Sequence, residues 1–232
     1  MIVAGTFIQA LHFIASNPEL LLTKAVEQLK LSAAALGVAL LIALPLGVVL
    51  GHLHRGSGLA IGASIFGRAL PSIFLIAVFL TVFGLGFENN MVALAVLAIG
   101  PILTNCYLGV EGVDRDAVDA ARGMGLSGMA ILWRIELPLA LAFIFTGIRI
   151  AAVTVVATAP IAALAGGGGL GDIIVNQATY RFPGVLGASF CVMALSAGVW
   201  MGFLALEKWT TPRGVRAGRV HASAGELRKE GL

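Results

Sequence analysis

A polar stretch between long apolar runs constrains this chain more than any other feature of its sequence. Residues 114–138 read DRDAVDAARGMGLSGMAILWRIELP and carry charges of both signs, whereas charge almost vanishes on either side. The flanking runs are long enough to cross a bilayer, which takes about 20 residues. The polar stretch must therefore lie in water, as a loop between membrane spans.

The composition agrees with a polytopic membrane protein rather than with a soluble domain. Of the 232 residues, 59% are hydrophobic and 12% are charged, whereas soluble domains average about 45–50% apolar and about 25% charged residues. This length allows one compact transmembrane domain and little else.

The apolar runs predict an all-α polytopic membrane protein with about five transmembrane helices. The predicted spans are residues 29–51, 69–85, 91–110, 139–164 and 183–206. The predicted parts of the chain are an N-terminal interfacial segment (1–28), a transmembrane domain (29–206) and a basic tail (207–232). A new helix is expected to open at Asn17-Pro18-Glu19, and Gly47 with Gly51 forms a small-x-x-x-small pair that favours close helix packing.

Basic residues are distributed unequally between the two sides of these spans. One side would hold Arg55, Arg68, Arg115, Arg122, Arg134 and the six basic residues from Lys208 onward. The other side would hold Lys24, Lys30 and Arg181. Because Lys and Arg are enriched on the cytoplasmic side, we expect the loop at 114–138 and the C-terminus to be cytoplasmic and the N-terminus to lie outside.

The pattern within residues 114–138 predicts two short helices. Asp116 is a suitable N-cap for the first helix, Gly123 and Gly125 would end it, and Ser127 is a suitable N-cap for the second. An alanine-lined helix with glycine exits suits docking into a groove of another protein, because small side chains allow close approach. From the residues alone, an ordinary loop helix is an equally good interpretation.

The same stretch resembles the EAA signature of ABC importer permeases, which is Glu-Ala-Ala, three residues, Gly, nine residues and Ile-x-Leu-Pro. The matching residues are Asp119, Ala120, Ala121, Gly125, Ile135, Leu137 and Pro138. The one departure is Asp119 in place of Glu, which keeps the charge but shortens the reach. The resemblance implies a type I ABC importer permease fold, in which this loop is the coupling helix. Ala120 and Ala121 would then face a groove of a separate ATPase subunit, and Gly125 would end the helix that docks there.

Further segments are similar to the branch of these permeases that imports osmoprotectants such as glycine betaine, choline and carnitine. They include Thr104-Asn105-x-Tyr107-x-Gly109, Gly147-Ile148-Arg149, Ala162-Ala163-Leu164 and Gly168-Gly169-Leu170-Gly171. The resemblance covers about residues 20–208 and departs at Pro160, where no proline is expected. It implies a subunit of the bacterial inner membrane that works by alternating access. The partners it implies are an ATPase, an extracytoplasmic solute-binding protein and a second permease subunit.

A glycine-rich run follows the fourth predicted span. Gly166-x-Gly168-x-x-Gly171 matches a dinucleotide-binding pattern, but that motif needs a preceding strand and a following helix, and the predicted topology places the run on the outer face. We instead expect a gate-side outer loop, either flexible or tightly packed, built on Gly166, Gly168, Gly169 and Gly171.

Arg149 is the one basic residue well inside a predicted span. A charge at the bilayer centre costs roughly 2.5–3.5 kcal/mol on insertion scales, so Arg149 should face protein or water. An interfacial position reached by snorkelling is favoured over a role in the solute pathway.

Other functions leave no signature in this chain. It has no P-loop and no convincing nucleophile–base pair or metal site, so we expect a lipid-embedded transport subunit, not an enzyme, without a cofactor, a metal or a nucleic-acid partner. One alternative is an ABC permease for an amino acid or an oxyanion. A secondary transporter would need inverted repeats and intramembrane ion ligands, and a structural scaffold would not depend on an ATPase.

Overall fold

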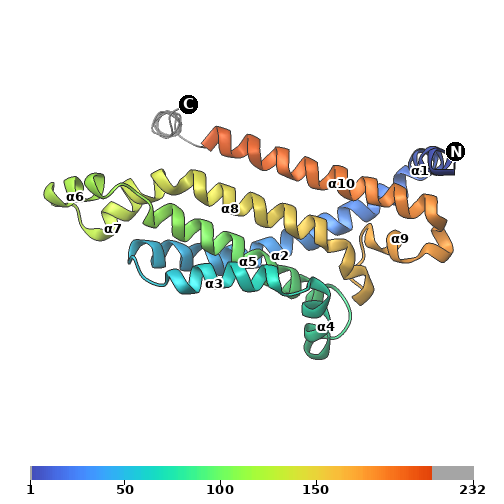
Figure 1. Cartoon of the computed structure of the whole chain (residues 1–232), viewed down its shortest axis with the longest axis horizontal. Coiled ribbons are helices and arrows are strands. Elements are labelled where there is room, and N and C mark those ends of the chain that lie inside the picture. Colours follow the sequence, from blue (N-terminus) through green and yellow to red (C-terminus); the bar gives the residue numbers. More distant parts are fainter. Residues whose placement is uncertain (1, 211–232) are drawn as a thin grey trace, which may run out of the picture.

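The computed structural model describes residues 2–210, and all of their regular structure is helical, which confirms the all-α fold class. The helices are α1 (Ile2–Ser16), α2 (Pro18–His52), α3 (Ser57–Ala69), α4 (Ser72–Phe83), α5 (Phe87–Glu111), α6 (Arg115–Gly123), α7 (Gly128–Ile131), the π-helix η1 (Leu132–Glu136), α8 (Leu137–Thr158), the 3-10 helix η2 (Ala159–Ala165), α9 (Gly171–Val175) and α10 (Gln177–Thr210). The long helices lie side by side along the molecule, with α6 and α7 at one end and α1 and α9 at the other (Figure 1). Most of the predicted basic tail, residues 211–232, lies outside the described residues.

Four helical runs of the described chain are long and apolar enough to cross a membrane. They are Pro18–His52, Phe87–Glu111, Gly128–Ala165 and Gln177–Glu207. Each contains one of the predicted spans, and each extends beyond it. α2 opens at Pro18, as the sequence predicts, because proline fits the first turn of a helix, where its missing N–H is not needed.

The predicted span at residues 69–85 corresponds to α4, with only Ala69 belonging to the preceding helix α3. α3 ends at Ala69 and α4 begins at Ser72. The 12 residues of α4 extend about 18 Å, which is short of a hydrocarbon core of about 30 Å. Pro71 explains the break, because it has no N–H to continue α3 and disfavours helical backbone at the residue before it. The sequence prediction missed α3, because its residues lie between two predicted spans.

The predicted span at residues 139–164 belongs to a longer helical run. α7, η1, α8 and η2 follow one another without a loop from Gly128 to Ala165. The π-helix η1 directly precedes the first turn of α8, which contains Pro138. A proline lacks the N–H that an α-helical hydrogen bond would need, and the wider π-turn lies where that bond is lost.

α5 forms the centre of the bundle and packs against α2, α3, α4 and α8. Gly47 and Gly51 of α2 lie directly on it: a Cβ atom added at Gly47 would be only 2.6 Å from the Cβ of Cys106. On α8, a Cβ atom added at Gly147 would be 2.6 Å from the Cβ of Asn105. The predicted close packing at Gly47 and Gly51 is therefore confirmed, and α8 approaches α5 in the same way.

Arg149 forms an ion pair with a residue of α10. Its Nη1 atom lies 2.7 Å from Oε2 of Glu207, and both side chains are largely buried. Arg149 thus faces protein, as expected from the free-energy cost of placing a charge in lipid. The pair joins the middle of the run Gly128–Ala165 to the C-terminal part of α10, a contact that the sequence did not predict.

Candidate functional site

The polar loop, residues 114–138, contains the two predicted short helices, α6 and α7. The N-cap of α6 is Asp114, whose side chain accepts a hydrogen bond from the N–H of Asp116 at 3.0 Å. The prediction that Asp116 is the cap is therefore wrong by two residues. α6 ends at Gly123, and Gly125 follows with φ +81°. Ser127 caps α7 as predicted, accepting from the N–H of Ala130.

A small hydrophobic core holds the polar loop together. Val113, Val118, Ala121 and Ile131 are buried in it, with Leu126 and Ile135 packed against them. Ala121 is fully buried, so the prediction that its side chain faces outward is wrong. Ala120, the next residue back, is exposed. Ala121 points inward because it lies three residues after buried Val118, and residues three apart on a helix share a face.

Several predicted residues lie inside the protein rather than on one surface. Asp119, Ala120 and Gly125 are exposed, whereas Ile135 packs on the loop core and Leu137 packs on the membrane core. Pro138 lies in the first turn of α8. The predicted motif therefore combines an exposed helix with the residues that anchor it.

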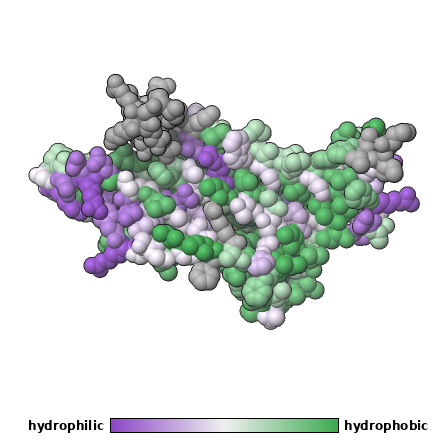
Figure 2. Space-filling view, in the orientation of Figure 1, coloured by the Kyte–Doolittle hydropathy of each residue, from purple (hydrophilic) through white to green (hydrophobic). Residues whose placement is uncertain are grey.

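Large apolar side chains of the polar loop are exposed. Met124, Met129 and Trp133 are each at least 65% exposed, although hydrophilic side chains gather over this end of the molecule (Figure 2). Exposed apolar side chains within a polar region mark a surface that contacts another molecule when they gather. Sequence reasoning did not single out these three residues.

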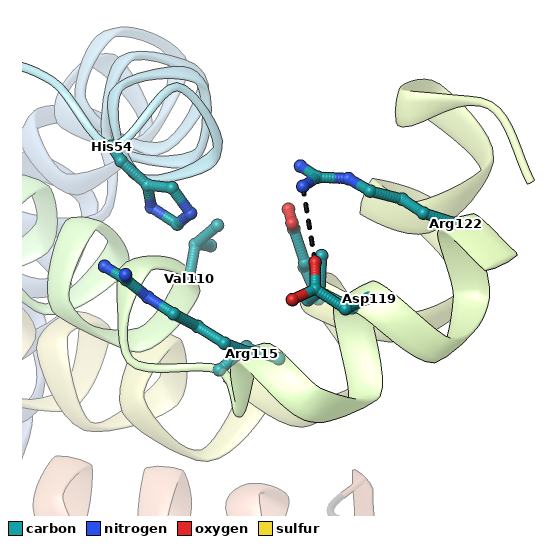
Figure 3. A pocket seen from close by; sticks show the side chains of 8 residues that line it. His54, Val110, Arg115, Asp119 and Arg122 are labelled. Atoms are coloured by element: carbon teal, nitrogen blue, oxygen red, sulfur yellow. Dashed lines mark hydrogen bonds and ion pairs between the residues drawn. The ribbon is translucent and has the colours of Figure 1, made fainter.

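A pocket of about 230 Å³ separates the polar loop from the ends of α2 and α5. His54 faces it from the turn after α2, and Arg115, Asp119 and Arg122 face it from α6 (Figure 3). Asp119 and Arg122 form an exposed ion pair at 3.5 Å. The pocket therefore carries charges of both signs.

Glu136 lines the same pocket and is almost completely buried. Its Oε2 atom lies 2.6 Å from Nδ1 of His52, the last residue of α2. Sequence reasoning missed this pair. A signal was present, because a carboxylate at the start of an apolar span requires a polar partner once it is buried, and His52 ends another such span.

The glycine loop, residues 166–171, lies at the opposite end of the molecule and is tightly packed. Gly166, Gly168 and Gly169 have φ between +73° and +79°, a region that L-residues rarely adopt. The N–H of Gly169 donates to Oε2 of Glu27 at 3.1 Å. Of the two predicted alternatives, the contacts favour close packing over a flexible linker.

Two polar contacts of α2 extend this anchoring. Lys24 Nζ lies 2.7 Å from Oδ2 of Asp172, directly after the glycine loop. Gln28 Nε2 donates to the carbonyl oxygen of Val156 at 2.9 Å. That carbonyl lies four residues before Pro160, which cannot donate to it because proline has no N–H. Gln28 thus satisfies a group that Pro160 leaves free, which explains how the helical run accommodates this proline at the start of η2.

The family model described as "Binding-protein-dependent transport system inner membrane component" matches residues 21–213. The chain is 32% identical over 209 residues to the glycine betaine/carnitine/choline transport system permease protein OpuCB of Bacillus subtilis (strain 168), covering 90% of this chain and 96% of that protein. It is 34% identical over 192 residues to the carnitine transport permease protein OpuCB of Listeria monocytogenes, covering 82% and 87%. An inward-facing structure of the MetNI methionine ABC transporter superimposes with a TM-score of 0.71 at 22% identity, covering 83% of this chain and 97% of that one.

The backbone of Gly125 provides a test of the exit from α6. Neither Gly123 nor Gly125 has an atom within 4 Å of an added Cβ, so the two differ by the positive φ of Gly125. We expect Gly125→Ala to destabilise the loop by about 1 kcal/mol, because a β-carbon is strained there. That corresponds to about five-fold faster amide hydrogen exchange in α6.

Two variants serve as controls for this measurement. Gly123→Ala should leave exchange in α6 unchanged or slower, and Gly125→Asn should retain most of the protection because asparagine tolerates this conformation. Equal acceleration by the alanine substitutions at Gly123 and Gly125 would contradict the assignment of strain to Gly125.

Proposed function

This chain belongs to the family of binding-protein-dependent transport system inner membrane components, and from that membership we propose that it is the permease subunit of an ATP-driven importer of osmoprotectants. The observation that carries the proposal is similarity at about one third identity over most of the chain to permeases named for glycine betaine, carnitine and choline. The match covers the spans, the polar loop and the glycine loop together.

The polar loop is the proposed contact with the ATPase subunit. Its exposed helix α6 is held by an internal core and presents Ala120, with exposed Met124, Met129 and Trp133 around it in sequence. Small residues allow close approach, and exposed apolar side chains lose contact with water when a partner covers them. This combination supports docking better than it supports an ordinary loop helix, which has no use for three exposed large apolar side chains.

The proposed cycle is alternating access. ATP would draw two ATPase subunits together, the polar loops would move with them, and the helices would rock as bodies. A second permease subunit would complete the pathway. An extracytoplasmic binding protein would deliver the solute at the end that carries the glycine loop.

Orientation in the membrane follows the distribution of basic residues. With the polar loop in the cytoplasm, the N-terminus lies outside, the C-terminus inside, and the turn between α4 and α5 faces outward. In intact cells, an impermeant thiol reagent should label a cysteine introduced at exposed Glu88, in the first turn of α5 directly after that turn, and should not label one introduced at Met129. The reverse pattern would overturn the orientation.

The docking surface can be tested by placing a large side chain at Ala120. Ala120→Trp should weaken co-purification of the ATPase about five-fold or more, because overpacking a well-packed contact costs about 1–3 kcal/mol. Arg122→Lys, which keeps an exposed charge, should leave association unchanged. Ala121→Trp is a different experiment, because it would disrupt the internal core of the loop. Full association of Ala120→Trp would exclude α6 as the contact.

Uptake by the whole importer tests the solute. Cells or proteoliposomes that contain this permease, its ATPase and its binding protein should accumulate labelled glycine betaine, choline or carnitine, and ATP depletion should abolish this accumulation. Uptake of methionine or an oxyanion instead would move the protein to another branch of the family. Loss of uptake on collapse of the proton gradient with ATP intact would indicate a secondary transporter, and uptake without an ATPase would contradict the importer altogether.

A further inference from the structure

α2 contacts both the polar loop and the glycine loop, and it lies beside the helical run Gly128–Ala165, which joins the two loops along the chain. Its last residue, His52, bonds to Glu136 of the polar loop. Its first turns carry Lys24 and Glu27, which bond to Asp172 and to the glycine loop. The 28 positions between Lys24 and His52 correspond to about 42 Å along a helix. Figure 1 shows α2 running between the two ends of the molecule.

The contact at the polar loop is partly buried and directional. The ring of His52 lies between the two ends of the segment 128–136: Nδ1 is 2.6 Å from Glu136 Oε2, and a Cβ added at Gly128 would be 3.6 Å from Nε2. Glu136 is almost completely buried. A hydrogen bond to a charged group fixes both distance and angle, so a displacement of this segment must be followed by His52 or must break the bond.

The part of the polar loop before Glu136 is packed together as one unit. Val118 and Ala121 of α6 share a core with Ile131 of α7, and Ile135 packs against it one residue before Glu136. Packed cores shift as bodies rather than deform continuously. A displacement of α6 is therefore transmitted through this core to Glu136.

The opposite end of α2 holds the glycine loop at two points. Glu27 accepts from the N–H of Gly169, and Lys24 bonds both to Glu27 and to Asp172. The room is limited, since a Cβ at Gly168 would lie 3.1 Å from Glu27 Oε2 and one at Gly169 would lie 3.1 Å from Gln28 Cβ. A shift of α2 along or about its axis must therefore move this loop.

We propose that α2 is a strut that transmits displacement of the polar loop to the glycine loop, beside the run Gly128–Ala165 that joins them along the chain. The His52–Glu136 pair is the joint at one end, and the Glu27–Gly169 bond is the joint at the other. His52, Glu136 and Glu27 are positioning residues for transport. The inference rests on the proposed function, because it takes the ATPase to move α6. Its physical warrant is a continuous helix with directional bonds at both ends, rather than mere proximity.

The first experiment separates transmission from stability. His52→Leu or Glu136→Leu alone leaves a buried polar group unpaired and should lower the amount of assembled importer. The double variant His52→Leu/Glu136→Leu removes both groups, which is often neutral for stability, and should restore assembly. Uptake by the restored complex should stay at least ten-fold below wild type, with solute-stimulated ATP hydrolysis lost and the ATPase still bound.

Conservative changes supply the matched comparison. His52→Gln keeps an N–H donor for Glu136 and should retain more uptake than His52→Leu. Leu53→Gln, at the exposed neighbouring position, should leave uptake unchanged. A double leucine variant with wild-type uptake per assembled complex would overturn the joint and leave the pair with a purely structural role. The wild-type complex in the same assay tests the proposed function separately.

The second joint gives an independent comparison that does not depend on a buried group. Glu27 is partly exposed, so its substitution carries little folding burden. Glu27→Leu removes the acceptor for Gly169 and should lower uptake several-fold with ATPase association intact, whereas Glu27→Gln keeps a carbonyl acceptor and should retain most of it. Full uptake by Glu27→Leu would show that α2 does not act on the glycine loop through this bond.

Discussion

Close backbone contact between α5 and its neighbours is the interaction on which this structure depends. Lipid tails are as apolar as leucine, so helices in a membrane gain little by hiding apolar side chains from lipid and associate through close packing instead. Gly47 and Gly147 let α2 and α8 approach α5 so closely that no β-carbon fits between them. α2 and α8 therefore pack closely around α5. α10 lies outside this group, since its most apolar window has no buried residue.

The membrane imposes a second condition on the backbone, because each polar group buried away from water needs a partner within the protein. Three contacts near the glycine loop meet it. Gln28 donates to the Val156 carbonyl that Pro160 leaves free, and the Asn90 side chain donates to the carbonyls of Gly86 and Ala165. These bonds fix η2 and the start of the glycine loop against α2 and α5. A loop that the sequence allows to be flexible is thus held closely by the need to satisfy its backbone.

The sequence predicted the class of fold, most spans and the position of the polar loop, because these depend on hydropathy and on motif spacing. It did not predict α3, which lies between two predicted spans. It could not show that Ala121 points inward, because both faces of α6 carry small residues. The His52–Glu136 pair joins residues 84 positions apart, and no local pattern specifies such a contact. What the sequence left open is therefore mostly the pairing of elements, not their existence.

Polar residue pairs determine which helices lie side by side where apolar surfaces alone leave this undetermined. Lys24–Asp172, His52–Glu136 and Arg149–Glu207 each join helices distant in sequence. Apolar contacts allow several registers between two helices, whereas each polar pair requires one register. Breaking a largely buried pair such as Arg149–Glu207 leaves a charge without its partner, which is strongly destabilising. Such pairs fix the axial register of the helices they join. In the proposed cycle the helices move as bodies, and these pairs would be the points at which motion passes from one element to the next; two of the three lie on α2.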